Sequence, residues 1–322
     1  AEALTSNTTA NQNTAVGRYA LRQTTTGSNN VAMGYASLIQ NTTGIGNTAY
    51  GHNSLYANTT ANNNTAVGTN AAVANTTGTQ NTSVGASALT ANTTANYNTA
   101  VGASALVVNT TGAQNTAVGS FSLQSNTTGS PNTALGYDAL GDNTTAAGNT
   151  AVGWSSLSKT TTGYANTAVG QSSLTANTTG FSNVAVGHNT LDISTTGSAN
   201  TAVGKSALSS ATTASNNTAV GTNSLFANTT GYEQTAVGYR ALTTNSTGFR
   251  NTAFGADSLL LNTTGFDNAA FGKSAMQDNT VGEANTGIGN YALANNTTSD
   301  GSTAVGYQAL LTITTGSQNT AV

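Results

Sequence analysis

The chain has 322 residues, of which 5% are charged and 37% hydrophobic, with 36 glycines, one proline and no cysteine. A formal net charge of −3 and only seven scattered lysines and arginines provide no basic surface, so nucleic-acid binding is excluded. No segment approaches the ~18 apolar residues of a membrane-spanning helix, and we expect no membrane insertion. Low net charge, scarce proline and regularly placed hydrophobic residues also argue against intrinsic disorder.

A 17-residue repeat runs through the whole sequence. Glycine recurs at every seventeenth position from Gly17 to Gly306, without insertion or deletion. The repeat reads N-T-A-V-G-x-x-A-L-x-x-N-T-T-G-x-x, and Asn13 to Asn29 is a representative copy. Because no linker or change of composition interrupts it, residues 1–322 are predicted to form one continuous array. Both ends fall within a repeat, so we expect the array to belong to a longer fibre.

Each repeat is predicted to form short extended segments. Seventeen residues leave no room for a helix pair, and asparagine, threonine, valine and glycine are poor helix formers. In the representative copy, residues 13–16 are expected to form one strand and residues 20–25 a second extended segment. Two or three such strands per repeat, stacked repeat on repeat, predict an all-β, parallel β-solenoid of 17 residues per coil and about nineteen coils. At ~4.8 Å per coil, nineteen coils would extend on the order of 90 Å.

Two apolar positions in the repeat are predicted to fill the core. The residue before the glycine is apolar in every copy, and the fourth residue after it is leucine in almost every copy. The alanine between threonine and valine would then point outward, because successive strand residues face opposite sides. Its restriction to small residues would indicate close contact with a neighbouring chain or with another part of the coil. The predicted core ladder includes Val16, Leu21, Leu38, Val67, Leu89, Val101, Leu106, Val118, Leu123 and Leu140.

Asparagine occupies two positions of the repeat. The first opens the repeat, and its stacked side chains are predicted to form an amide ladder between coils. The second, in Asn-Thr-Thr, has two interpretations that we leave open: another amide ladder at a corner, or an acceptor for N-glycosylation that would make the chain a glycoprotein. The candidate acceptors are Asn7, Asn41, Asn58, Asn75, Asn92, Asn109, Asn126, Asn143, Asn177, Asn228, Asn245, Asn262 and Asn296.

Three aromatic residues recur at one corner position of consecutive repeats. Tyr232, Phe249 and Phe266 are spaced by 17 residues, so they are predicted to stack into a column. Exposed apolar patches usually mark contacts, so this column is either a candidate contact strip or simply a well-stacked corner.

The sequence contains no constellation typical of catalysis. His52 and His188 occupy variable corner positions eight coils apart, too far to share a site within one solenoid. Asp138 and Asp142, beside Asn143, are candidates for a weak cation site, but the aspartate-bearing repeat of calcium-binding β-rolls is absent. We therefore expect solvated acids there, and a non-enzymatic protein with no cofactor and no metal.

The repeats resemble those of a known group of surface proteins. The strings around Gly221, Gly238 and Gly306 read NTAVGTNSLFANTTG, QTAVGYRALTTNSTG and STAVGYQALLTITTG. They are similar to the NTAxGYxAL–NTTG repeats of bacterial and phage tail-fibre-like surface proteins, and more distantly to the head repeats of trimeric autotransporter adhesins. The resemblance covers the whole chain. It implies a parallel β-roll, often trimeric, at a cell or virion surface.

We therefore predict a structural extracellular fibre or adhesin shaft that associates with itself, end to end as a filament or as a homotrimer. One alternative is a phage or virus tail-fibre segment that attaches to glycans or cell-surface receptors. Another is an ice-binding solenoid, suggested by threonine-rich columns such as Thr42-Thr43. Adjacent threonines on a strand face opposite sides, however, and an outward Thr-x-Thr pair is missing.

Overall fold

The computed structural model describes residues 2–322, which contain nineteen short β-strands and no helix. The chain comprises two compact units, Ala1–Thr162 and Gly163–Val322, each built from the same 17-residue coil. The first unit carries β1 (Thr14–Val16), β2 (Val31–Met33), β3 (Thr48–Tyr50), β4 (Thr65–Val67), β5 (Thr82–Val84), β6 (Thr99–Val101), β7 (Thr116–Val118), β8 (Thr133–Leu135) and β9 (Thr150–Val152). The second carries β10 (Thr167–Val169), β11 (Val184–Val186), β12 (Thr201–Val203), β13 (Thr218–Val220), β14 (Thr235–Val237), β15 (Thr252–Phe254), β16 (Ala269–Phe271), β17 (Thr286–Ile288), β18 (Thr303–Val305) and β19 (Thr320–Ala321).

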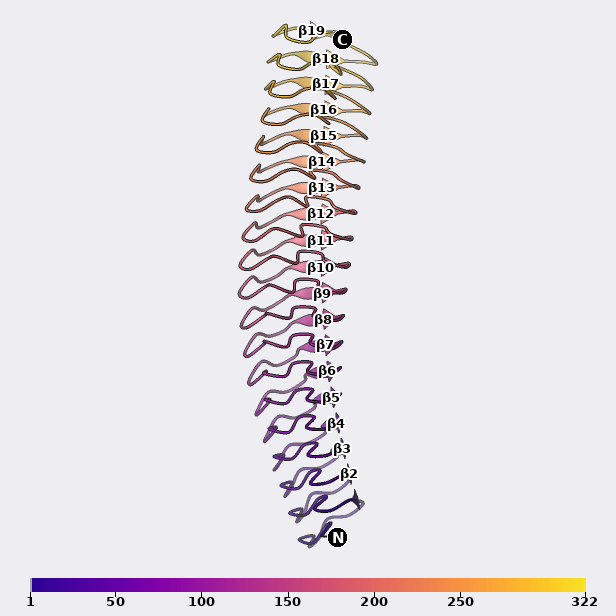
Figure 1. Cartoon of the computed structure of the whole chain (residues 1–322), viewed down its shortest axis with the longest axis vertical. Helices are drawn as coiled ribbons and strands as arrows, with labels where there is room; N and C mark the ends of the chain where they lie inside the picture. Colours follow the sequence, from indigo (N-terminus) through magenta and orange to yellow (C-terminus); the bar gives the residue numbers. More distant parts are fainter. Residues whose placement is uncertain (1) are drawn as a thin grey trace. The chain divides into compact units, whose positions relative to one another are not determined.

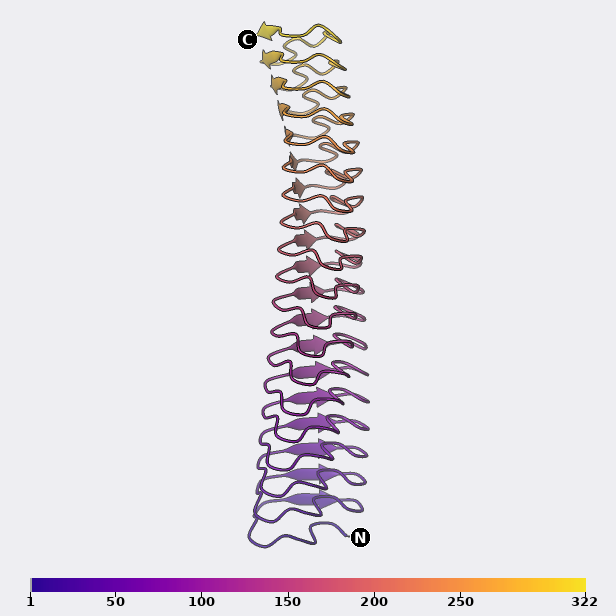
Figure 2. The ribbon, with the colours of Figure 1, turned by 90° about the vertical axis from the view of Figure 1, so that its left-hand side faces the viewer.

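Within each unit every strand pairs in parallel with the strand of the next coil (Figure 1). The register is one full repeat: Thr116, Ala117 and Val118 lie beside Thr133, Ala134 and Leu135. Figure 2 shows the strands of the first unit in one column, with irregular turns on either side. The predicted all-β parallel β-solenoid is therefore confirmed.

Each coil contains one strand, where the sequence predicted two or three. The second segment curls because residues in the left-handed region alternate with others: Gly119 (φ 131°), Phe121 (φ 61°) and Leu123 (φ 49°) in one coil. A non-glycine residue in this region is strained by roughly 1–2 kcal/mol. Complete burial of the Leu123 side chain, worth about 1.5–3 kcal/mol, offsets that strain. The curled segment also bonds to the next coil, since the Leu123 amide donates to the Ala139 carbonyl at 3.0 Å.

The orientation of the strand is the reverse of the prediction. Leu21, Leu38, Leu89, Leu106, Leu123 and Leu140 are fully buried, which confirms the leucine half of the predicted core. The valine half is wrong: Val16 is 52% exposed, and Val67, Val101 and Val118 face outward and are only partly buried. The alanine column faces inward instead, with Ala117 fully buried.

The narrow interior of the coil explains this orientation. At Gly287, which occupies the alanine position, an added Cβ would lie 3.0 Å from the Cγ of Met276, which occupies the leucine position. A methyl group on the strand therefore already touches the side chain from the opposite wall, and a valine pointing inward would not fit. The small size of the alanine column reflects packing inside one coil, so it is not the predicted outward contact face.

Two leucines in one coil provide a matched test of this orientation. Leu140 is fully buried, and Leu135, at the valine position, is 47% exposed. Leu140→Ala should lower the free energy of unfolding by ~2–5 kcal/mol because it leaves a cavity. Leu135→Ala should change it by no more than about 0.5 kcal/mol. Denaturant unfolding, at concentrations too low for self-association, measures both; a larger loss for Leu135→Ala would contradict the orientation.

Candidate interaction surfaces

The second asparagine column forms a buried ladder. The Asn109 amide donates to Asn92 Oδ1 at 3.2 Å and to the Gly112 carbonyl at 2.9 Å, and Asn109 Oδ1 accepts from the Asn126 amide at 2.8 Å. Both amide hydrogens and the carbonyl oxygen are thereby satisfied inside the coil. The predicted second ladder is confirmed.

The same geometry contradicts glycosylation at this position of the folded chain. A sugar would have to replace a hydrogen of a side-chain amide that is completely enclosed in the coil and already donates to a neighbouring oxygen. The prediction is wrong for the twelve buried acceptors Asn41, Asn58, Asn75, Asn92, Asn109, Asn126, Asn143, Asn177, Asn228, Asn245, Asn262 and Asn296. Asn7, in the first coil, is exposed.

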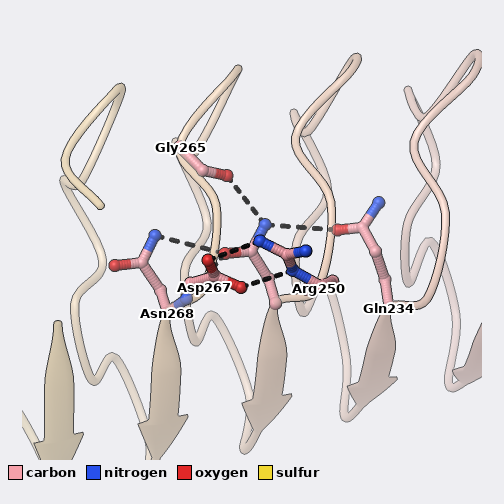
Figure 3. Close-up of polar contacts among 6 residues, drawn as sticks. Gln234, Arg250, Gly265, Asp267 and Asn268 are labelled. Carbon is pink, nitrogen blue, oxygen red and sulfur yellow. Dashed lines mark hydrogen bonds and ion pairs between the residues drawn. The ribbon is translucent and has the colours of Figure 1, made fainter. Parts of the chain in front are cut away.

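The first asparagine column is a second buried ladder, also as predicted. Asn115 Oδ1 accepts from the backbone amide of Asn132 at 2.9 Å, and the Asn115 amide donates to the Gly129 carbonyl at 2.9 Å. Gln234 occupies this position once. The ladder continues through it, because the Asn251 amide donates to Gln234 Oε1 at 3.5 Å and to the Gly265 carbonyl at 2.8 Å. Gln234 and Gly265 are labelled in Figure 3.

Removing one amide from the ladder should destabilise the coil. Asn109→Ala deletes two donated bonds and leaves the Asn126 amide without one acceptor, in a region closed to water. An unsatisfied buried polar group costs about 1–3 kcal/mol, and we expect a loss of unfolding free energy in that range. Asn295→Ala, at an exposed side chain, is the control and should be neutral within about 0.5 kcal/mol. Equal losses for both variants would contradict a structural role of the ladder.

The predicted aromatic column forms. The rings of Tyr232 and Phe249 are stacked at 5.1 Å between centroids, and those of Phe249 and Phe266 at 4.8 Å. Beside them the Arg250 guanidinium lies 4.8 Å from the centre of the Phe249 ring and bonds both carboxylate oxygens of Asp267, at 2.6 and 2.7 Å (Figure 3). These bonds lower the pKa of Asp267. Because the ion pair is exposed, we expect it to order the corner more than to stabilise the fold. A contact role for the column stays a prediction.

The outward face of the strands was missed by the sequence reasoning. In every described coil its final residue is apolar, and several of these side chains are large and exposed: Tyr50 (56%), Leu135 (47%), Phe254 (41%) and Phe271 (40%). Threonine, two residues earlier, lies on the same face. We call these two columns the strand face. The sequence did carry a signal for this orientation, because the residues at the last strand position range in size from valine to tyrosine and phenylalanine. A packed interior does not accept such different side chains at equivalent places.

The histidines and acids have ordinary surroundings. His52, in the first unit, stacks on Tyr35 at 5.2 Å between ring centres; His188 belongs to the second unit. Asn143 is buried in the amide ladder, where its amide donates to Asn126 Oδ1. Across residues 2–322, no three His, Cys, Asp or Glu side chains gather closely enough to hold a metal ion. The same residues form no helix that is long and apolar enough to cross a membrane.

No protein-family model matches the sequence, and a search of curated proteins finds no match. The resemblance of the repeats to tail-fibre-like proteins and adhesin heads therefore stays a prediction.

Proposed function

We propose that the chain is the shaft of an extracellular fibre or adhesin in which copies associate side by side through the strand face. The observation that carries this proposal is the apolar residue that ends the outward strand face in each described coil. An exposed position that is never polar is not explained by contact with water alone. Coverage by another copy explains it.

A second copy of the chain is the best-matched occupant of this face. Both copies carry columns with the same axial spacing, ~4.8 Å per coil, so side chains of one copy fit between those of the other along the whole contact. The strands themselves carry no charged residue, so close approach of two identical faces meets no like-charge repulsion. The resemblance of the repeats supports the extracellular setting of this proposal.

The strand face also bears on ice binding. Threonine and valine form two parallel outward columns on most strands, which supplies a regular pair in place of the missing Thr-x-Thr. However, Tyr50, Phe254 and Phe271 interrupt the flat surface that a crystal plane would require. We therefore favour contact between chains, and expect no thermal hysteresis in a freezing assay. A clear hysteresis gap would instead indicate that the strand face binds ice.

Charged substitutions on the strand face should prevent association. Phe254 and Phe271 stack at 5.5 Å on neighbouring strands, and a Phe254→Arg/Phe271→Arg variant would place two buried charges in the proposed interface. We expect the unsubstituted chain to form a multimer and this variant to be monomeric in sedimentation velocity. Circular dichroism checks that it stays folded.

The control is Phe181→Arg/Phe226→Arg, which changes two equally exposed phenylalanines of the same unit outside the strands. This control should associate like the unsubstituted chain. A monomeric unsubstituted chain at high concentration, or equal loss of association in both variants, would contradict the proposal.

A further inference from the structure

One pocket in the first unit departs from the regularity of the coils. Its volume is about 370 Å³, within the range of small-molecule sites, and it is lined by Phe121, Gln124, Tyr137, Asp138, Asp142 and Lys159. These residues come from three consecutive coils. None of the six residues belongs to a strand.

Gly141 makes room for the Asp138 carboxylate, which forms part of the pocket wall. The equivalent position is Gln124 in the preceding coil and Ser158 in the following one, and every other copy of the repeat also has a side chain there. Gly141 is not in the left-handed region, so the backbone does not require glycine. A Cβ at this place would collide with the Asp138 carboxylate, which leans over Gly141. The glycine is thus explained by the position of one carboxylate.

The walls combine aromatic rings with groups that donate and accept hydrogen bonds. Phe121 and Tyr137 meet edge to face at 5.7 Å between ring centres, and both are exposed. Lys159 Nζ lies 3.0 Å from Asp142 Oδ2, so the charges of these two side chains balance each other. Partial burial raises the pKa of the Asp138 carboxyl, although Lys159 opposes the shift. The Ser155 side chain also hydrogen-bonds the Asp138 carboxylate, so the remaining acceptor positions of that carboxylate and the Gln124 amide are the groups left for a ligand.

We propose that this pocket binds a pyranose ring of a neutral sugar. The C–H face of a pyranose packs against an exposed aromatic ring, while its neighbouring hydroxyls act as both donors and acceptors. A carboxylate accepts from two such hydroxyls, and an amide or an ammonium group satisfies their oxygens. The proposal goes beyond the shaft function, because it holds whether or not copies of the chain associate.

Other classes of ligand fit the walls less well. An anion would approach two carboxylates and only one ammonium group, already paired with Asp142. A divalent cation prefers six or more oxygen ligands, and the pocket offers two carboxylates, one of them engaged by Lys159. A purely apolar ligand would strip water from Asp138 and Gln124 without replacing their hydrogen bonds.

Saturation-transfer NMR with methyl glycosides of glucose, galactose, mannose and N-acetylglucosamine tests the proposal. This measurement detects weak binding, with dissociation constants of about 1 mM. At least one glycoside should receive saturation from the unsubstituted chain. Gly141→Ser introduces the residue of the next coil and displaces the Asp138 carboxylate, and we expect the signal to be lost. Tyr137→Ala should weaken binding roughly tenfold or more, through loss of the ring face.

The matched control for Tyr137→Ala is Tyr239→Ala, because both tyrosines directly follow the repeat glycine and are about half exposed. The control should bind the glycoside like the unsubstituted chain, and thermal unfolding confirms that each variant is folded. No saturation transfer to any of the four glycosides would overturn the proposal. Binding that survives both Gly141→Ser and Tyr137→Ala would also overturn it, since the sugar would then lie elsewhere.

Discussion

The structure depends on hydrogen bonding between one coil and the next at an offset of about seventeen residues. Strands, turns and both asparagine columns all bond along the same direction, so each coil is completed by its neighbours. Such a stack tolerates little change at positions where backbones meet. An added Cβ on Gly119 would collide with the carbonyl of Gly136, its equivalent in the next coil. The glycine spacing seen in the sequence is therefore a consequence of close contact between coils, as well as of the positive φ that this position requires.

The buried amide columns add specificity to that stacking. A core made only of leucine and alanine would pack similarly in several registers between two neighbouring coils. Most asparagines, in contrast, bond their equivalents in the neighbouring coils, and a shift of register would leave these buried donors and acceptors unsatisfied. Asn109, between Asn92 and Asn126, illustrates this requirement. Gln234 shows its limits: its longer side chain still reaches Asn251, at a less favourable distance of 3.5 Å.

Periodicity predicted the fold class, the leucine column and both amide ladders, because each depends only on identical residues lying beside one another. The direction of the strand's side chains was not predictable from alternation alone, since alternation fixes which residues share a face and not which face is inside. The volume opposite the strand decides that question. With Leu140 and its equivalents filling the coil, only alanine fits, and Leu135 turns outward. The curled second segment was missed because leucine at φ near 50° is rare and has no sequence signature.

In a repetitive chain, a residue type that recurs in every coil supports the stack or a contact that extends along it. The apolar column of the strand face belongs to this class, which is why we associate it with another copy of the same periodic chain. A residue that breaks the repeat acts locally instead. Gly141 is such a residue: it is not required by its own backbone conformation, and it admits one carboxylate beside two aromatic rings. Periodic positions are therefore the basis of the proposed assembly, and Gly141, one departure from the repeat, is the basis of the proposed small-ligand site.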